Sequence, residues 1–369
     1  MLIAGYATSE GTERFRKRFE NRLPGHFREA RGLWLSSIGI GTYLGEPDAQ
    51  CDKSYAAAVS LALDLGVNVI DSAVNYRHQR SERAIGRALH EQIRGGALCR
   101  DEVFLATKGG FLSFDGDAPR DPHAYFYEQV IQSGLAKPEE VAAECHVISP
   151  AYLKQQIEVS CRNLGVETID LYYVHNPETQ LAAVGRGEFR ARLMDAFSAL
   201  EWAVMQGKIR FYGVATWNAF RTGGESRDAF QLGEALSAAE EAGGKKHHFC
   251  AVQLPFNFAM TEALTKPTQK LAGRSVPLLR AASELGLMVF ASASLLQGQL
   301  TEGLPPEIAS HFPSFKTDAQ RSLQFVRSTP GITCALVGMS NPRHVEENLA
   351  TASMPPLTLD AYQAIYSGS

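Results

Sequence analysis

The chain has 369 residues, of which 45% are hydrophobic and 21% charged, and these proportions exclude a collagen-like, coiled-coil or disordered protein. Its formal net charge of -4 at pH 7 argues against nucleic acid or an anionic membrane as the main partner. The sequence has neither a run of about 18 apolar residues nor an N-terminal apolar segment before a small-residue cleavage site, so we expect a cytoplasmic protein without a membrane span or secretory signal.

The N-terminal residues 1–34 are polar and charged, and they precede the first apolar run of the chain. We expect them to form an extension, as a hairpin or as a cover over the bottom of the domain that follows. The remaining residues 35–369 are predicted to form a single domain, because strand and helix patterns alternate through this whole range.

Eight short apolar runs, rich in Val, Ile, Leu, Phe and Tyr, alternate with longer segments of helical periodicity. Because the runs lack clean polar alternation, they are typical of strands buried on both faces of a parallel sheet. The predicted strands are residues 35–41, 67–71, 103–108, 169–175, 210–216, 249–254, 287–292 and 333–339. Eight such units predict an α/β fold, the (β/α)8 TIM barrel. A doubly wound sheet is the competitor, but no G-x-G-x-x-G follows the first strand.

Residues 109–148 separate the third predicted strand from its helix, and about 40 residues is long for such a connection. In a barrel this insertion lies on the C-terminal face, where active sites form. Its aromatic residues have two interpretations: they line a substrate pocket, or they pack into a small core of their own. These residues are Phe111, Phe114, Tyr125, Phe126 and Tyr127. His146, at the end of the insertion, is a further candidate to reach the pocket.

Ionisable residues stand at the carboxyl ends of three successive predicted strands, namely Asp71, Lys108 and His175, with Tyr76 just beyond the first. At this end of a TIM barrel, such residues are typically catalytic. Lys108 can pair with Asp71 and is expected to lower the pKa of Tyr76, which makes the tyrosine a candidate general acid. His175 can orient a carbonyl oxygen or assist the proton transfer. Because no side chain supplies a hydride, carbonyl reduction here requires a nicotinamide cofactor.

In order and strand context, these four residues resemble the catalytic tetrad of the aldo-keto reductases. The resemblance covers about residues 35–352 and includes the Gly41-Thr42-Tyr43 turn, the helix motif at 81–89 and the C-terminal segment at 338–349. It implies a barrel that binds NADP(H) or NAD(H) without a Rossmann domain, with Tyr76 as the proton donor. The residues that it implies at the cofactor are Gly41, Thr42, Tyr43, Thr216, Gln253, Ser292, Leu295, Gln297, Gly338, Met339, Ser340, Arg343, His344, Glu347 and Asn348.

Two departures from the family pattern concern the nicotinamide. Ser292 stands where the family usually has a tyrosine that stacks on the ring, and Trp217 is one candidate replacement. Ala215-Thr216 replaces the usual Ser-Asn pair that holds the carboxamide. Either Thr216 or Asn218 is then expected to supply the hydrogen bonds.

A third departure concerns the cofactor's 2′-phosphate, which many family members hold with a lysine and an arginine. Gly338 and His344 occupy these places, with Arg343 beside the latter. Because a helix N-terminus also favours phosphate, we expect NADP(H) rather than NAD(H), without excluding NAD(H). No metal site is expected, since the six cysteines include no C-x-x-C pair and Cys145-His146 has no second pair at ligand spacing.

The predicted function is NAD(P)H-dependent reduction of an aldehyde or ketone to an alcohol, and the predicted partner is a small carbonyl compound. One alternative is a regulatory subunit of the same fold with little turnover, like the potassium-channel β subunits. Another is a metal-dependent hydrolase that uses Asp71 and His175, although further ligands are missing at the strand ends. We expect no nucleic-acid or membrane partner, and the sequence leaves both a monomer and a homo-oligomer open.

Overall fold

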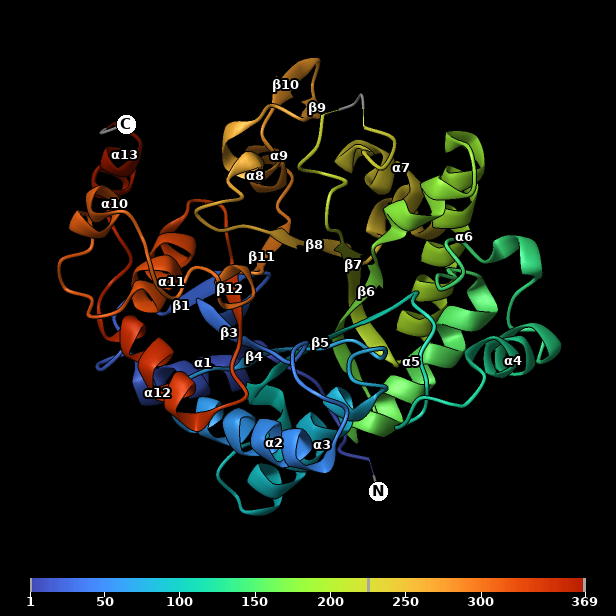
Figure 1. Cartoon of the computed structure of the whole chain (residues 1–369), viewed down its shortest axis with the longest axis horizontal. Helices are drawn as coiled ribbons and strands as arrows, with labels where there is room; N and C mark the ends of the chain where they lie inside the picture. The colour runs from blue at the N-terminus through green and yellow to red at the C-terminus, as the bar shows by residue number, and fades with distance from the viewer. Residues whose placement is uncertain (1, 224–225, 368–369) are drawn as a thin grey trace.

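Eight apolar strands close into a barrel in the computed structural model, which describes residues 2–223 and 226–367 (Figure 1). In spatial order they are β3 (Ile38–Gly41), β4 (Val69–Asp71), β5 (Phe104–Gly109), β6 (Ile169–His175), β7 (Ile209–Ala215), β8 (Phe249–Pro255), β11 (Met288–Ser292) and β12 (Cys334–Gly338). Neighbouring strands pair in parallel, and β12 closes the barrel on β3. The predicted (β/α)8 barrel is confirmed.

Helices surround the barrel and cover its outer face (Figure 1). The described helices are α1 (Ser9–Phe19), α2 (Ala49–Asp64), α3 (Arg80–Arg94), α4 (Pro122–Phe126), α5 (Pro150–Leu164), α6 (Arg186–Met205), α7 (Leu232–Gly243), α8 (Glu262–Thr265), α9 (Leu278–Glu284), α10 (Pro306–Ser310), α11 (Asp318–Ser328), α12 (Pro342–Ala350) and α13 (Leu359–Ser367). The ends of α5 illustrate the local signals, because Pro150 takes the first helical position and Gly165 ends the helix at φ 69°.

The barrel interior is filled by side chains from alternate strand positions. Phe104 stacks on Phe290 across the interior, with ring centroids 6.0 Å apart. A Cβ added at Gly39 would lie 2.8 Å from the Cys334 sulfur, so this strand position has room only for glycine. A second, larger apolar layer lies between the strands and the helices. Because the strands are buried on both faces, they read in the sequence as continuous apolar runs.

The N-terminal segment forms α1 and an antiparallel hairpin, β1 (Phe27–Ala30) with β2 (Leu33–Ser36). Leu33 and Leu35 join the interior cluster that contains Phe104 and Leu171. The predicted first strand, residues 35–41, is therefore divided: its first two residues belong to the hairpin, and the barrel strand begins at Ile38.

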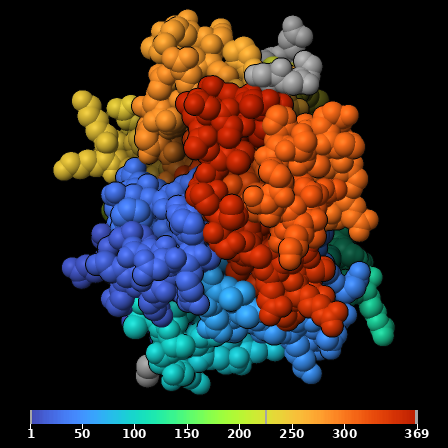
Figure 2. Space-filling view, turned by 90° about the vertical axis from the view of Figure 1, so that its left-hand side faces the viewer, coloured from blue at the N-terminus to red at the C-terminus, as the bar shows by residue number. Residues whose placement is uncertain are grey.

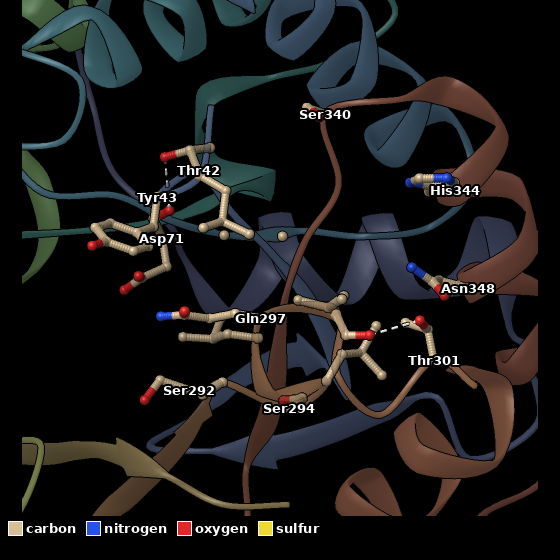
Figure 3. A pocket seen from close by; sticks show the side chains of 18 of the residues that line it. Thr42, Tyr43, Asp71, Ser292, Ser294, Gln297, Thr301, Ser340, His344 and Asn348 are labelled. Atoms are coloured by element: carbon tan, nitrogen blue, oxygen red, sulfur yellow. Dashed lines mark hydrogen bonds between the residues drawn. The ribbon is translucent and has the colours of Figure 1, made fainter. Parts of the chain in front are cut away.

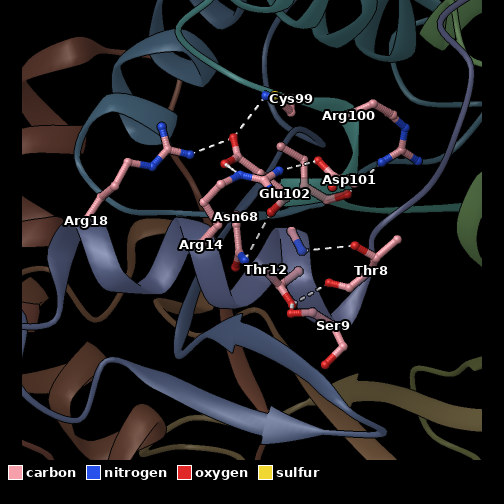
Figure 4. Close-up of polar contacts among 12 residues, drawn as sticks. Thr8, Ser9, Thr12, Arg14, Arg18, Asn68, Cys99, Arg100, Asp101 and Glu102 are labelled. Atoms are coloured by element: carbon pink, nitrogen blue, oxygen red, sulfur yellow. Dashed lines mark hydrogen bonds and ion pairs between the residues drawn. The ribbon is translucent and has the colours of Figure 1, made fainter.

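Charged contacts hold α1 against the barrel (Figure 4). Arg14 and Arg18 reach the carboxylate of Glu102 at 2.8 and 2.6 Å, and Arg14 also contacts Asp101 at 2.6 Å. Glu102 itself is buried, whereas the two arginines are partly exposed. The basic run of α1 therefore binds this chain's own acidic residues.

The first and last parts of the barrel lie side by side, although the two chain termini themselves are far apart in Figure 1. Figure 2 shows the red C-terminal segment beside the blue N-terminal segment. The pairing of β12 with β3 brings the last barrel strand against the first, and α12 packs beside α2. The cofactor segment implied at residues 338–349 is thereby placed next to the Gly41-Thr42-Tyr43 turn.

The insertion at residues 109–148 contains both structures that the sequence allowed. Phe114 stacks on Phe126 with centroids 4.9 Å apart, and Tyr125 packs edge-on against Phe114. Val130 belongs to a separate small apolar cluster of the insertion. Phe111 alone among the five aromatic residues lines the main cavity, so the insertion is partly pocket wall and partly its own core.

Candidate active site

A cavity of about 1220 Å³ opens at the carboxyl ends of the barrel strands. Figure 3 shows its elongated course, with Asp71 and Ser292 toward one end and His344 and Asn348 toward the other. The structure brings together at its wall most of the residues that the sequence singled out: Gly41, Thr42, Tyr43, Asp71, Tyr76, His175, Thr216, Gln253, Ser292, Leu295, Gln297, Gly338, Ser340, His344, Glu347 and Asn348.

Three of the predicted site residues lie away from the cavity wall. Lys108 is buried behind Asp71 and Tyr76 and reaches the site through them. Met339 is fully buried in the apolar core beside Gly338. Arg343 is exposed near the start of α12 and does not line the cavity. The neighbouring His344 and Ser340 take the positions at the wall.

Lys108 and Asp71 form a buried ion pair behind the cavity. The Lys108 Nζ atom lies 2.5 Å from Asp71 Oδ1, 2.7 Å from the Ser72 carbonyl oxygen and 3.4 Å from the Tyr76 hydroxyl. The other oxygen of Asp71 accepts a hydrogen bond from Gln253 Nε2 at 2.7 Å. The ammonium group thus has two fixed oxygen partners and directs its third contact to the tyrosine at the cavity wall.

Burial and charge act in opposite directions on Tyr76. Burial raises the pKa of its hydroxyl above the ordinary value of 10.0, and the nearby Lys108 cation opposes this shift. The sequence predicted a lowered pKa, and this net direction is wrong, because the loss of solvent outweighs the attraction of the cation. At neutral pH the hydroxyl therefore keeps its proton and can act as an acid.

His175 packs edge-on against Tyr76 at the cavity wall, with ring centroids 5.8 Å apart. Its Nδ1 atom is buried without a hydrogen-bond partner within residues 2–223 and 226–367. Burial, with Lys108 and His146 nearby, lowers the pKa of His175 well below 6.5, so the ring is neutral. A neutral imidazole carries one N–H group and one lone pair, and an unpaired buried lone pair costs less free energy than an unpaired buried N–H. We therefore assign the lone pair to Nδ1 and the proton to Nε2, which can donate toward the cavity.

The two carboxamide candidates differ in whether their side chains already have hydrogen-bond partners. The side chain of Asn218 is occupied, since its Nδ2 donates to Asp228 at 2.9 Å and its Oδ1 accepts from Arg221 at 3.3 Å. Thr216 lines the cavity, and its buried hydroxyl has no partner in the described part of the chain. Thr216 is therefore the residue with a free hydrogen-bonding group.

The aromatic rings that are exposed at the cavity wall follow β3 and β7 rather than β11. Ser292 ends β11 at the cavity wall and offers no stacking face (Figure 3). Tyr43 and Trp217 both line the cavity with 55% and 39% of their surface exposed. Both rings are therefore accessible from the cavity.

The start of α11 forms a part of the wall that the sequence did not indicate. Lys316, Thr317, Asp318 and Arg321 line the cavity there, and Arg321 pairs with Asp318 at 2.6 Å. Thr317 is the N-cap of the helix, and its hydroxyl accepts the Gln320 N–H. A helix start that follows the connection after β11 could have indicated these residues, because that connection emerges on the C-terminal face.

Among the described residues, no three His, Cys, Asp or Glu side chains are grouped as a metal site would require. No helix within residues 2–223 and 226–367 combines the length and apolar character needed to cross a bilayer.

Comparison with known proteins places this geometry in a family. The model of the aldo/keto reductase family matches residues 37–224, about half of the chain. L-glyceraldehyde 3-phosphate reductase of Escherichia coli K12 is 25% identical over 193 residues, which span 52% of this chain and 44% of that protein. The uncharacterized oxidoreductase YqkF of Bacillus subtilis is 21% identical over 339 residues, 91% of this chain and 93% of that protein.

A solved structure shows the same fold over nearly the whole chain. An aldo/keto reductase from Klebsiella pneumoniae, in complex with NADP and acetate, superposes with a TM-score of 0.61 at 22% identity. The match covers 93% of this chain and 94% of that one. With the family model spanning half of its length and the barrel shared throughout, this chain belongs to the aldo/keto reductase family of oxidoreductases.

Proposed function

We propose that the protein reduces a small aldehyde or ketone to an alcohol with a nicotinamide cofactor, NADP(H) in preference to NAD(H). The observation that carries the proposal is the buried Lys108–Asp71 pair, which lies 3.4 Å behind the Tyr76 hydroxyl at the wall of a large cavity. An acid held in this way, beside the neutral His175, suits an oxygen atom that gains negative charge.

The cavity fits a nicotinamide dinucleotide by its own residues. Thr216 and Gln253 offer side-chain hydrogen-bonding groups near Asp71, and the elongated wall continues to Ser340 and His344 at the start of α12. Lys316 adds positive charge at that far end, where a phosphate would also meet a helix N-terminus. The Klebsiella protein of the same fold was solved with NADP.

The bound nicotinamide would supply the hydride that reduces the carbonyl carbon. The residues of this chain would manage the charge on the carbonyl oxygen. His175 Nε2–H orients that oxygen and donates a hydrogen bond to it. Tyr76 transfers its proton to the oxygen, so the phenolic O–H bond breaks as the alcohol O–H bond forms. Lys108 then stabilises the phenolate left on Tyr76.

Two measurements test the proposal. Titration with NADPH and with NADH, followed by quenching of tryptophan fluorescence, should show binding of both, with NADPH the tighter. Turnover of an aldehyde panel should follow, and Tyr76→Phe should lower kcat by about 10²- to 10⁴-fold while NADPH still binds. The proposal fails if neither nucleotide binds, or if Tyr76→Phe turns over at the wild-type rate.

The alternative of a regulatory subunit with little turnover gains no support from a specific observation, since the tetrad is assembled at an open cavity. Turnover in the same panel distinguishes the two functions. A protein that binds NADPH tightly but reduces none of the aldehydes would favour the alternative.

A further inference from the structure

We propose that His146 is a positioning residue that holds the backbone carbonyl of His175 and so fixes the direction of the His175 imidazole toward the substrate. The proposal rests on the function proposed above and assigns a role to the long insertion at residues 109–148. His146 is the last histidine of that insertion, and it lies outside the cavity wall.

The central contact joins a buried side chain to the catalytic strand end. The Nε2 atom of His146 lies 2.7 Å from the carbonyl oxygen of His175, and the His146 residue is fully buried. The backbone around His146 is itself fixed, because it bridges to Phe111 at the start of the insertion. The hydrogen bond therefore connects a rigid part of the insertion to the end of β6.

The neighbours of His146 determine which ring nitrogen carries the proton. Arg192 donates to Gln180 Oε1 at 2.7 Å, so the amide nitrogen of Gln180 must face the other way. That nitrogen donates to His146 Nδ1 at 2.9 Å. Since Nδ1 accepts this bond, the proton of the neutral ring sits on Nε2, where it is donated to His175.

The ring of His146 also stays neutral across the physiological range. Burial lowers the pKa of His146 to about 4, although its bond to the His175 carbonyl opposes the shift. The hydrogen bond to His175 therefore does not depend on protonation of the ring near pH 7.

The contact matters because the chain turns sharply at this point. Asn176, the next residue, has φ 45°, and its N–H donates to the Ala215 carbonyl at 2.6 Å. The His175 carbonyl is thus turned toward the insertion, and His146 supplies its donor. The Phe111 ring packs edge-on against both imidazoles, with centroids 4.9 Å from each. His175 is held by the insertion at its ring and at its backbone.

A matched pair of substitutions separates this role from packing. His146→Asn keeps an oxygen that can accept from Gln180 but is too short to reach the His175 carbonyl. His146→Gln is longer and places an amide N–H near the position of Nε2. We expect His146→Asn to lower kcat by about 10- to 100-fold and His146→Gln to restore most of it, because small displacements of catalytic groups have effects of this size. His123→Asn, an exposed site on α4, is the control and should leave kcat unchanged.

A double-mutant cycle shows whether His146 acts through His175. In a His175→Ala background, His146→Asn should cause no further loss of kcat. A loss of equal size in both backgrounds would overturn the proposal, as would an unchanged kcat in His146→Asn alone.

A third measurement does not depend on turnover, so it keeps this proposal separate from the proposed function. In protein labelled with 15N-histidine, the ring resonances of His175 should shift in His146→Asn and return in His146→Gln. Resonances that do not move would overturn the positioning role even if the protein proves to be an active reductase. If resonances move as expected in a protein without reductase activity, only the proposed function fails.

Discussion

Each end of the barrel holds a buried ion pair, and the two pairs differ in what else they contact. At the N-terminal end of the barrel, the lower end, Arg100 Nη2 lies 2.7 Å from Asp170, whose oxygens also accept the backbone N–H groups of Ala7 and Leu105 at 2.7 and 2.9 Å. At the carboxyl end, the upper end, Lys108 pairs with Asp71 and directs a further contact to the Tyr76 hydroxyl.

The difference lies in the surroundings, since both pairs combine one cation with one carboxylate. The Asp170 carboxylate has its partners within the folded chain, including the N-terminal segment through Ala7, and no wall of the main cavity reaches it. Asp71 lines the cavity, and the ammonium group behind it remains coupled to a group that can exchange a proton. A buried ion pair becomes chemically useful where one of its contacts continues to an open site.

The largest effect should follow from Lys108→Met. Loss of the cation removes the stabilisation of the Tyr76 phenolate, and we expect kcat for aldehyde reduction to fall by about 10²- to 10⁴-fold. Lys154→Met is the matched control, because Lys154 lies over the Trp202 ring on the outside of the barrel. Equal kcat values in the two variants would remove Lys108 from the mechanism and make the upper pair as structural as the lower one.

Asp170→Asn tests the lower pair in the opposite way. Breaking a buried ion pair by removing one partner costs about 3–5 kcal/mol, so the free energy of unfolding should fall by that amount in denaturant titrations. The kcat of the protein that remains folded should equal that of the wild type. A stable Asp170→Asn protein with reduced kcat would show that the lower pair also acts on the active site.

Glu178 is a carboxylate at the upper end that has no cation partner within residues 2–223 and 226–367. It accepts the N–H groups of Trp217 and Asn218 at 2.7 and 3.3 Å, while burial raises its pKa from 4.5 to about 7. The folded state then binds a proton more tightly than the unfolded state, so this group makes stability fall as pH rises from about 4.5 to about 7.

Glu178→Gln removes that titration and should flatten the dependence of unfolding free energy on pH in this window. One pKa unit corresponds to about 1.36 kcal/mol. Between pH 4.5 and pH 7 and above, the unfolding free energy of the wild type should therefore fall by about 3 kcal/mol more than that of Glu178→Gln. Thermal or denaturant unfolding at pH 4.5, 6 and 8 measures it. Parallel pH profiles of the two proteins would contradict a raised pKa at Glu178.

The sequence predicted those features that depend directly on residue type and its position along the chain. Continuous apolar runs located all eight barrel strands, and the strand ends located Asp71, Tyr76, Lys108 and His175. The predicted direction of the pKa shift of Tyr76 was wrong. Charge can be inferred from residue types, whereas the burial that raises this pKa depends on the whole fold. The sequence suggested His146 only as a pocket residue, since its bond to a backbone carbonyl has no residue signature.

The N-terminal segment was the least predictable region, for a related reason. Helix α1 buries Phe15 and Phe19 in the core. In the sequence these two residues stand among charged residues, so the apolar face of the helix is not evident from the pattern. The hairpin strand β2 and barrel strand β3 are separated only by Ser37, so they read as one apolar run.

The smallest effect on stability should come from the exposed ion pairs of Arg14 on α1. Arg14→Ala removes contacts to Asp101 and Glu102, but the Arg14 side chain is 49% exposed, and pairs of this kind contribute about 0.2–1 kcal/mol. Arg18 would still hold Glu102, so the free energy of unfolding should fall by no more than about 1 kcal/mol, and less at high salt. Denaturant titrations at low and high salt measure both effects. A loss as large as that of Asp170→Asn would mean that the lower end depends on its surface charges as much as on its buried pair.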